Sequence, residues 1–177
     1  MKTQLNQSIR IVISLAVTLL IWGHIAWDYV HGGIPTHYIL HNKDLPGIPN
    51  WWGGLVLPLI TYFLLFRIQQ RIKKPASKET LQKIGLRFLS GLIFAVTISI
   101  CYMQDIQIVD FIMGLVFLMA FIFPIYKSEY FLGWVLGASF TFGAIIPIGF
   151  GSLLCLVFFI IYHLVGFIKS LLNSKGN

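Results

Sequence analysis

The sequence predicts an all-α, polytopic membrane protein, and three features of its composition point to this class. Of the 177 residues, 57% are apolar and only 11% carry a charge, whereas roughly 25% of residues are charged in soluble domains. The 15% of aromatic residues excludes a disordered chain. Too few polar side chains remain to cover the surface of a water-soluble enzyme or DNA-binding domain. We therefore expect residues 1–177 to form a single integral membrane domain.

Six apolar runs divide this domain. A helix needs about 20 apolar residues to cross the hydrocarbon core of a bilayer, and each run approaches this length. The chain must turn at an interface, because lipid offers no partners to unpaired backbone groups. The expected spans are residues 9–30, 51–70, 86–104, 108–126, 130–148 and 152–172.

The basic residues predict how the helical bundle is oriented. The chain has 13 Lys and Arg residues, and with the N-terminus inside, all of them except Lys43 fall on the cytoplasmic side. This asymmetry follows the positive-inside rule, so we expect both termini to be cytoplasmic and the membrane to be a bacterial inner membrane. The basic loop over residues 67–87 would attract anionic lipid heads or dock partner subunits. It lacks interleaved aromatic residues to stack on bases, so nucleic acid is not an expected partner.

The fifth span contains a GxxxG pair, Gly133 and Gly137, continued by Ser139 and Gly143. Small residues at this spacing allow two helices to approach closely. They predict a packing seam inside the bundle.

The segment that joins the first two spans is unusually rich in histidine and aspartate. On a helix, His24, Asp28 and His31 stand at positions i, i+4 and i+7, so they share one face at the outer end of the first span. Gly32 and Gly33 then end the helix, because glycine readily adopts the positive φ that a helix terminus needs.

The rest of this outer loop is expected to form a short helix. Pro35 suits the first turn of a helix, and His37 and His41 would share a face of it. Asp44 lies in a stiff, proline-containing turn, and Asn50 is the expected N-cap of the second span.

These residues predict a functional site on the outer side of the membrane. Imidazole and carboxylate groups at helical spacing suit a divalent transition metal, with zinc the first expectation, and aspartates within a membrane are costly enough to suggest function. The outer face also holds two carboxylates in and beside the turn between the third and fourth spans, which would act as general bases. The expected metal ligands are His24, Asp28, His31 and His37; the expected ligand-binding residues are Trp51, Trp52, Tyr38 and Asp44; and the expected catalytic residues are Asp110 and Asp105.

Two functional interpretations of different class follow from this site. In the first, a bound metal activates water, which gives a membrane-embedded, metal-dependent hydrolase or a lipid-modifying enzyme. In the second, the bundle is a binding or transport subunit, because its size and topology are similar to the substrate-binding membrane components of vitamin transporters. A structural subunit of a membrane complex, with polar residues that only cap and order the outer loop, remains a third interpretation.

Overall fold

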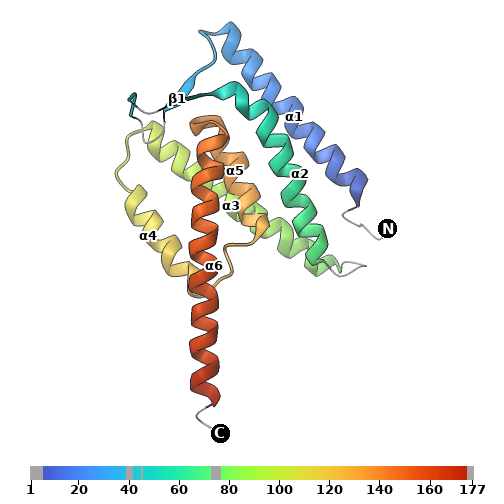
Figure 1. Cartoon of the computed structure of the whole chain (residues 1–177), viewed down its shortest axis with the longest axis vertical. Coiled ribbons are helices and arrows are strands. Elements are labelled where there is room, and N and C mark those ends of the chain that lie inside the picture. Colours follow the sequence, from blue (N-terminus) through green and yellow to red (C-terminus); the bar gives the residue numbers. More distant parts are fainter. Residues whose placement is uncertain (1–5, 39–41, 45, 73–76, 175–177) are drawn as a thin grey trace.

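The computed structural model describes residues 6–38, 42–44, 46–72 and 77–174. Figure 1 shows a bundle of helices with a small β-hairpin at one end. Along the chain, the elements are α1 (Gln7–Val30), β1 (Thr36–Tyr38), β2 (Gly47–Pro49), the 3₁₀ helix η2 (Asn50–Trp52), α2 (Gly53–Arg71), α3 (Lys78–Met103), α4 (Val109–Ala120), α5 (Ser128–Phe142) and α6 (Ile145–Ser174).

The predicted helical membrane class is confirmed, and four helices have the length and the apolar composition to cross a bilayer. These are α1, α2 together with η2, α3 and α6. The other two are shorter: α4 has 12 residues and α5 has 15. At 1.5 Å per residue they extend for about 18 and 22 Å, less than the ~30 Å of a hydrocarbon core. The count of six complete spans therefore stays a prediction.

The predicted boundary between the last two spans is wrong. We expected the fifth span to reach residue 148, whereas α5 ends at Phe142 and α6 already begins at Ile145. Gly143 turns the chain with a φ of +70°, a conformation that side chains disfavour. Pro147 lies in the first turn of α6, where its missing N–H group costs nothing.

The predicted helical outer loop is also wrong, because β1 and β2 form an antiparallel pair there. His37 lies opposite Ile48, and Thr36 lies opposite Pro49. A Cβ atom at Gly47 would lie 2.6 Å from Thr36 Cγ2, so glycine permits this close pairing. His37 thus lies on a strand, and His41 lies outside the described residues.

The predicted packing seam is confirmed where α5 meets α3. The backbone of α3 lies directly against Gly133, and a Cβ atom at Gly137 would lie 2.7 Å from Ala95 Cβ. On α3, Gly91 lies equally close to the backbone of Tyr130. The glycines on both helices therefore bring the two backbones together, and α5 is held in the interior of the bundle.

The two ends of the bundle differ in structure and in charge. At one end lie the connection between α1 and α2, the α3–α4 turn and the α5–α6 turn (Figure 1); we call this the hairpin end. At the other end α2 finishes, α3 begins and the linker 121–127 leads into α5; we call this the basic end. Among the described residues, Lys43 is the one Lys or Arg at the hairpin end, as the charge asymmetry predicts. The orientation across the membrane itself stays a prediction.

Candidate functional site

Three polar side chains from two parts of the chain meet at the hairpin end. His24 and Asp28 lie one turn apart on α1, with His24 Nε2 3.6 Å from Asp28 Oδ2. Asn50, in η2, donates from Nδ2 to the same carboxylate oxygen at 3.5 Å. The helical spacing therefore places His24 beside Asp28 as predicted. Asn50 is buried and binds Asp28 rather than capping α2, whose N-cap makes no side-chain hydrogen bond.

His37 joins this group through the turn between α5 and α6. A Cβ atom at Gly143 would lie 2.7 Å from His37 Cδ2 and 3.2 Å from Asn50 Oδ1. The bare backbone of Gly143 thus lets the hairpin and η2 lie against the same turn. The buried Oδ1 of Asn50 accepts no hydrogen bond from the described residues. The structure therefore gathers His24, Asp28, Asn50 and His37 into what we call the outer polar cluster.

His31, the remaining predicted metal ligand, has other partners. It caps the C-terminus of α1 and is exposed. Its Nδ1 atom lies 3.0 Å from the carbonyl oxygen of Trp27, and its ring stacks on the Trp27 indole with 3.7 Å between centroids. Gly32 and Gly33 follow with φ values of +126° and +100°, which confirms the predicted helix end.

The predicted ligand-binding residues lie around the hairpin. Trp51 and Trp52 stack on each other, with 4.9 Å between ring centroids, and both are exposed. Tyr38 lies against Gly47 on the opposite strand. Asp44 is exposed, and its backbone N–H donates to the side chain of Asn42 at 2.9 Å. This hydrogen bond orders the turn, and a role of these residues in ligand binding stays a prediction.

The two predicted catalytic carboxylates, Asp105 and Asp110, are exposed at the α3–α4 turn and in the first turn of α4. Asp105 adopts a φ of +53°, which is typical of a turn residue. Over the described part of the chain, no three His, Cys, Asp or Glu side chains form a group that could hold a metal ion. The zinc site and the catalytic roles of these aspartates therefore stay predictions.

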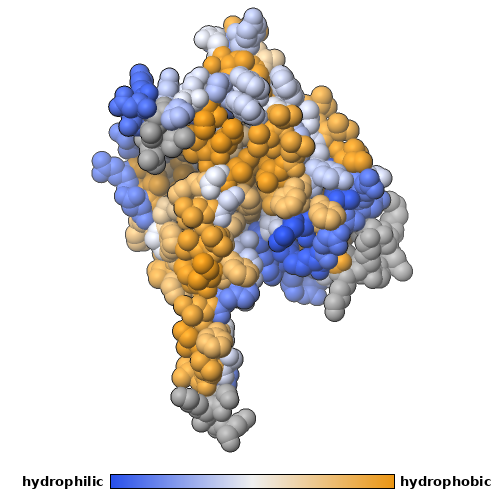
Figure 2. All heavy atoms as spheres, in the orientation of Figure 1, coloured by the Kyte–Doolittle hydropathy of each residue, from blue (hydrophilic) through white to orange (hydrophobic). Residues whose placement is uncertain are grey.

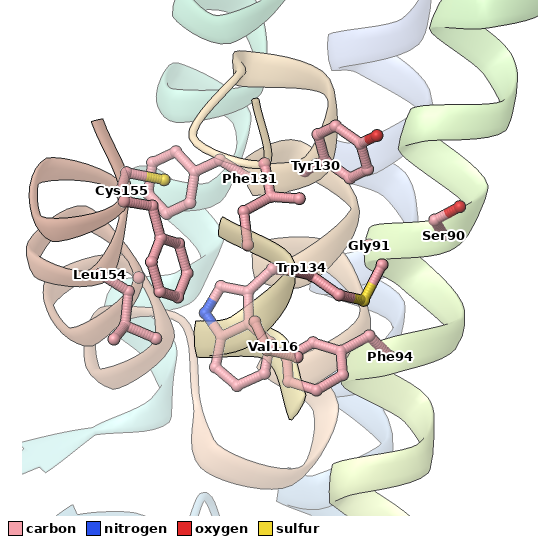
Figure 3. A pocket seen from close by; sticks show the side chains of 13 residues that line it. Ser90, Gly91, Phe94, Val116, Tyr130, Phe131, Trp134, Leu154 and Cys155 are labelled. Atoms are coloured by element: carbon pink, nitrogen blue, oxygen red, sulfur yellow. The ribbon is translucent and has the colours of Figure 1, made fainter. Parts of the chain in front are cut away.

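The structure also contains a cavity that the sequence did not indicate. It has a volume of about 180 Å³ and lies between α3, α4, α5 and α6. Figure 3 shows Phe94 on the α3 side, Leu154 on the α6 side and Trp134 of α5 between them. Its lining is overwhelmingly apolar: Ser90, Gly91, Phe94, Val116, Met119, Ile125, Tyr130, Phe131, Trp134, Gly151, Leu154, Cys155 and Phe158.

A buried ion cluster lies at the basic end. Glu129, in the first turn of α5, is fully buried and forms an ion pair with Arg71 from the end of α2. Arg87 of α3 also reaches it, with Nη1 3.6 Å from Glu129 Oε1. The second carboxylate oxygen of Glu129 is buried and accepts no hydrogen bond from the described residues. We call these three residues and Lys127 the Glu129 cluster.

Lys127 belongs to this cluster because it is the N-cap residue of α5, half-buried and two residues before Glu129. Burial lowers the pKa of the Lys127 ammonium group, and the positive charges of Arg87 and Arg71 lower it further, whereas Glu129 raises it. The basic residues of the 67–87 loop predicted topology and attraction to lipid heads, but not a buried ion pair with Glu129. An acid at the start of an apolar span, on the side predicted to be basic, is the signal that could have identified the cluster.

No protein-family model, curated protein or solved structure matches this chain.

Proposed function

We propose that this protein binds a membrane lipid, with an acyl chain of the lipid in the cavity between α3, α4, α5 and α6. The cavity itself is the observation that supports this function. Its lining residues include no Asp, Glu, His, Lys or Arg among those described, so it offers no charged partner to a polar substrate. An apolar chain would instead replace the missing contacts of Phe94, Trp134 and Leu154.

The helix lengths explain how a lipid would reach this cavity. With only 12 residues, α4 is too short to cover the full height of α3 and α6. Its contacts with these helices are few, and one of them is the edge-to-face contact between Phe117 and Phe158, with 5.1 Å between ring centroids. The surface of α6 is largely apolar (Figure 2), which suits contact with lipid chains beside the cavity.

Two tryptophan substitutions on α6 provide a matched test. Leu154 lines the cavity, whereas its neighbour Leu153 is 59% exposed on the outside of the helix. The variants Leu154→Trp and Leu153→Trp add the same side chain, but only the first fills the cavity. After purification in a mild detergent, we expect lipid to remain with the wild-type protein and with Leu153→Trp, and to be depleted in Leu154→Trp.

Quantification of lipid per protein by mass spectrometry after organic extraction is the readout. Equal lipid content in the two variants, with both still folded by circular dichroism, would show that the cavity does not hold the lipid. Absence of bound lipid from the wild-type protein would also refute the proposal.

A second candidate is the metal-dependent membrane hydrolase, and the outer polar cluster is the observation that favours it. His24, Asp28 and Asn50 lie in contact at the hairpin end, and the amide oxygen of Asn50 has no partner among the described residues. Elemental analysis of the purified protein tests this candidate. Stoichiometric zinc that is lost in Asp28→Asn and retained in Asp44→Asn would support it, whereas metal-free wild-type protein would count against it.

A further inference from the structure

The apolar cavity and the Glu129 cluster are neighbours at the basic end of the bundle. Arg87 lies one helical turn before Gly91 on α3, a rise of about 6 Å, and Gly91 lines the cavity. Lys127 follows two residues after Ile125, and Glu129 immediately precedes Tyr130; both Ile125 and Tyr130 also line the cavity. An acyl chain in the cavity would therefore place its head group close to these charged side chains.

The charge of the cluster indicates which head groups it favours. Arg71 and Arg87 contact the Glu129 carboxylate, and Lys127 lies two residues before it at the start of α5. Three cations thus stand beside one carboxylate, and two positive charges remain uncompensated. Their mutual repulsion is part of the reason why the Lys127 pKa is lowered. A nearby anion would relieve this repulsion, and the partial burial of Lys127 would strengthen the attraction. Hydrophilic residues cluster on this part of the surface, where α2 ends and α3 begins (Figure 2).

Glu129 holds the guanidinium groups in place without using all of their donors. The Arg71 side chain is 40% exposed and that of Arg87 is 27% exposed, while Glu129 is fully enclosed. Each guanidinium has five N–H donors, more than the Glu129 contact requires. Arginine forks of this kind bind phosphate oxygens in bidentate geometry.

We propose that the Glu129 cluster binds the phosphate of an anionic phospholipid whose acyl chain occupies the adjacent cavity. Arg87 and Lys127 contact the phosphate, and Glu129 positions Arg71 and Arg87 for it. This inference rests on the proposed lipid-binding function and adds the chemical class of the lipid. The predicted cytoplasmic location of the basic end places this lipid in the inner leaflet.

Competition between two lipids tests the inference. The purified protein is incubated in mixed micelles with equal amounts of phosphatidylglycerol and phosphatidylcholine, and native mass spectrometry measures the ratio bound. The variants are Lys127→Gln and Arg87→Gln, with Arg67→Gln as the control, because Arg67 is exposed on α2 and its loss changes the net charge equally. Lys127→Gln leaves both ion pairs of Glu129 intact, so it separates binding from folding.

We expect the wild-type protein and Arg67→Gln to prefer phosphatidylglycerol. Loss of one charge-assisted hydrogen bond should reduce this preference roughly tenfold in Lys127→Gln and Arg87→Gln. In contrast, Leu154→Trp should lose both lipids together.

Three results would overturn the inference. The first is an unchanged preference in both Lys127→Gln and Arg87→Gln, and the second is a wild-type protein that binds the two lipids equally. The third is displacement of phosphatidylglycerol by an equal concentration of inorganic phosphate, which would mean that the cluster binds a soluble phosphate compound. A wild-type protein that retains neither lipid would instead refute the lipid-binding function, and this inference with it.

Discussion

Removal of the Arg71 guanidinium should destabilise the protein strongly, because it takes away the nearest partner of a fully buried carboxylate. Glu129 has no exposed surface, and a second arginine, Arg87, lies 3.6 Å from it. Breaking a buried ion pair by removing one member typically costs about 3–5 kcal/mol. Since Arg87 remains in Arg71→Met, we expect a loss near the lower limit, about 3 kcal/mol.

A double-mutant cycle separates this ion pair from the packing around it. Replacing both partners with apolar residues of similar volume is often close to neutral, so Arg71→Met combined with Glu129→Met should recover most of the stability lost in Arg71→Met. Arg67→Met is the matched control on the same helix, and a change of at most about 0.5 kcal/mol is expected for an exposed position.

Unfolding by sodium dodecyl sulfate in mixed micelles, followed by tryptophan fluorescence, gives the required free energies. Equal and small losses in Arg71→Met and Arg67→Met would refute the reasoning. A double variant whose loss is the sum of the two single losses would do so as well, because it would show that Arg71 and Glu129 are not energetically coupled.

Three further predictions concern the bundle and its orientation. Gly133→Leu should lower the unfolding midpoint sharply, whereas Gly114→Leu should change it little, because a side chain at Gly133 meets the α3 backbone and one at Gly114 meets open space; thermal unfolding of both variants in one detergent compares them. In intact cells, Lys43→Cys should react with a membrane-impermeant maleimide and Lys78→Cys should not, and the reverse pattern would invert the predicted topology. Gly33→Val should disturb the connection after α1, because valine disfavours a φ of +100°; faster proteolysis within residues 31–50 in an otherwise folded protein is the expected result, and wild-type protease resistance would contradict it.

The sequence predicted the structure correctly where the conformation depends on neighbouring residues in the chain. Gly32 and Gly33 end α1 with positive φ values, as expected of paired glycines at a helix terminus. Gly133 and Gly137 bring α5 directly against α3, as GxxxG spacing predicts. Both outcomes depend on the size of a single side chain and on its immediate neighbours.

The predictions of the outer loop and of the α5–α6 boundary were wrong because contacts with distant segments of the chain determine both structures. Pro35 is compatible with the start of a helix, but the residues after it pair with Gly47–Pro49, and this pairing depends on the fit between Gly47 and Thr36. The α5–α6 boundary similarly depends on Gly143, which packs against His37 and Asn50 from another part of the chain. Contacts of this kind are not visible in apolar periodicity.

The candidate sites were likewise predicted where they depend on one helix and missed where they depend on contacts between helices. Helical spacing placed His24 beside Asp28 correctly, because both lie on α1. The cavity could not be predicted, because its volume depends on how four helices pack around Trp134. Glu129 was missed because its partners, Arg71 and Arg87, lie on two other helices, and pairing between them requires the α2–α5 and α3–α5 contacts.

Photo-crosslinking with a lipid that carries a diazirine in its acyl chain tests the central claim most directly. Phosphatidylglycerol labelled in this way is mixed with the wild-type protein, and the sample is irradiated. Peptide mass spectrometry then identifies the residues that the lipid has modified. The proposed function predicts labelling concentrated on cavity residues such as Val116 and Leu154, and competition by unlabelled phosphatidylglycerol. Labelling spread evenly over outward-facing residues such as Leu153 and Leu156, without enrichment in the cavity, would contradict it.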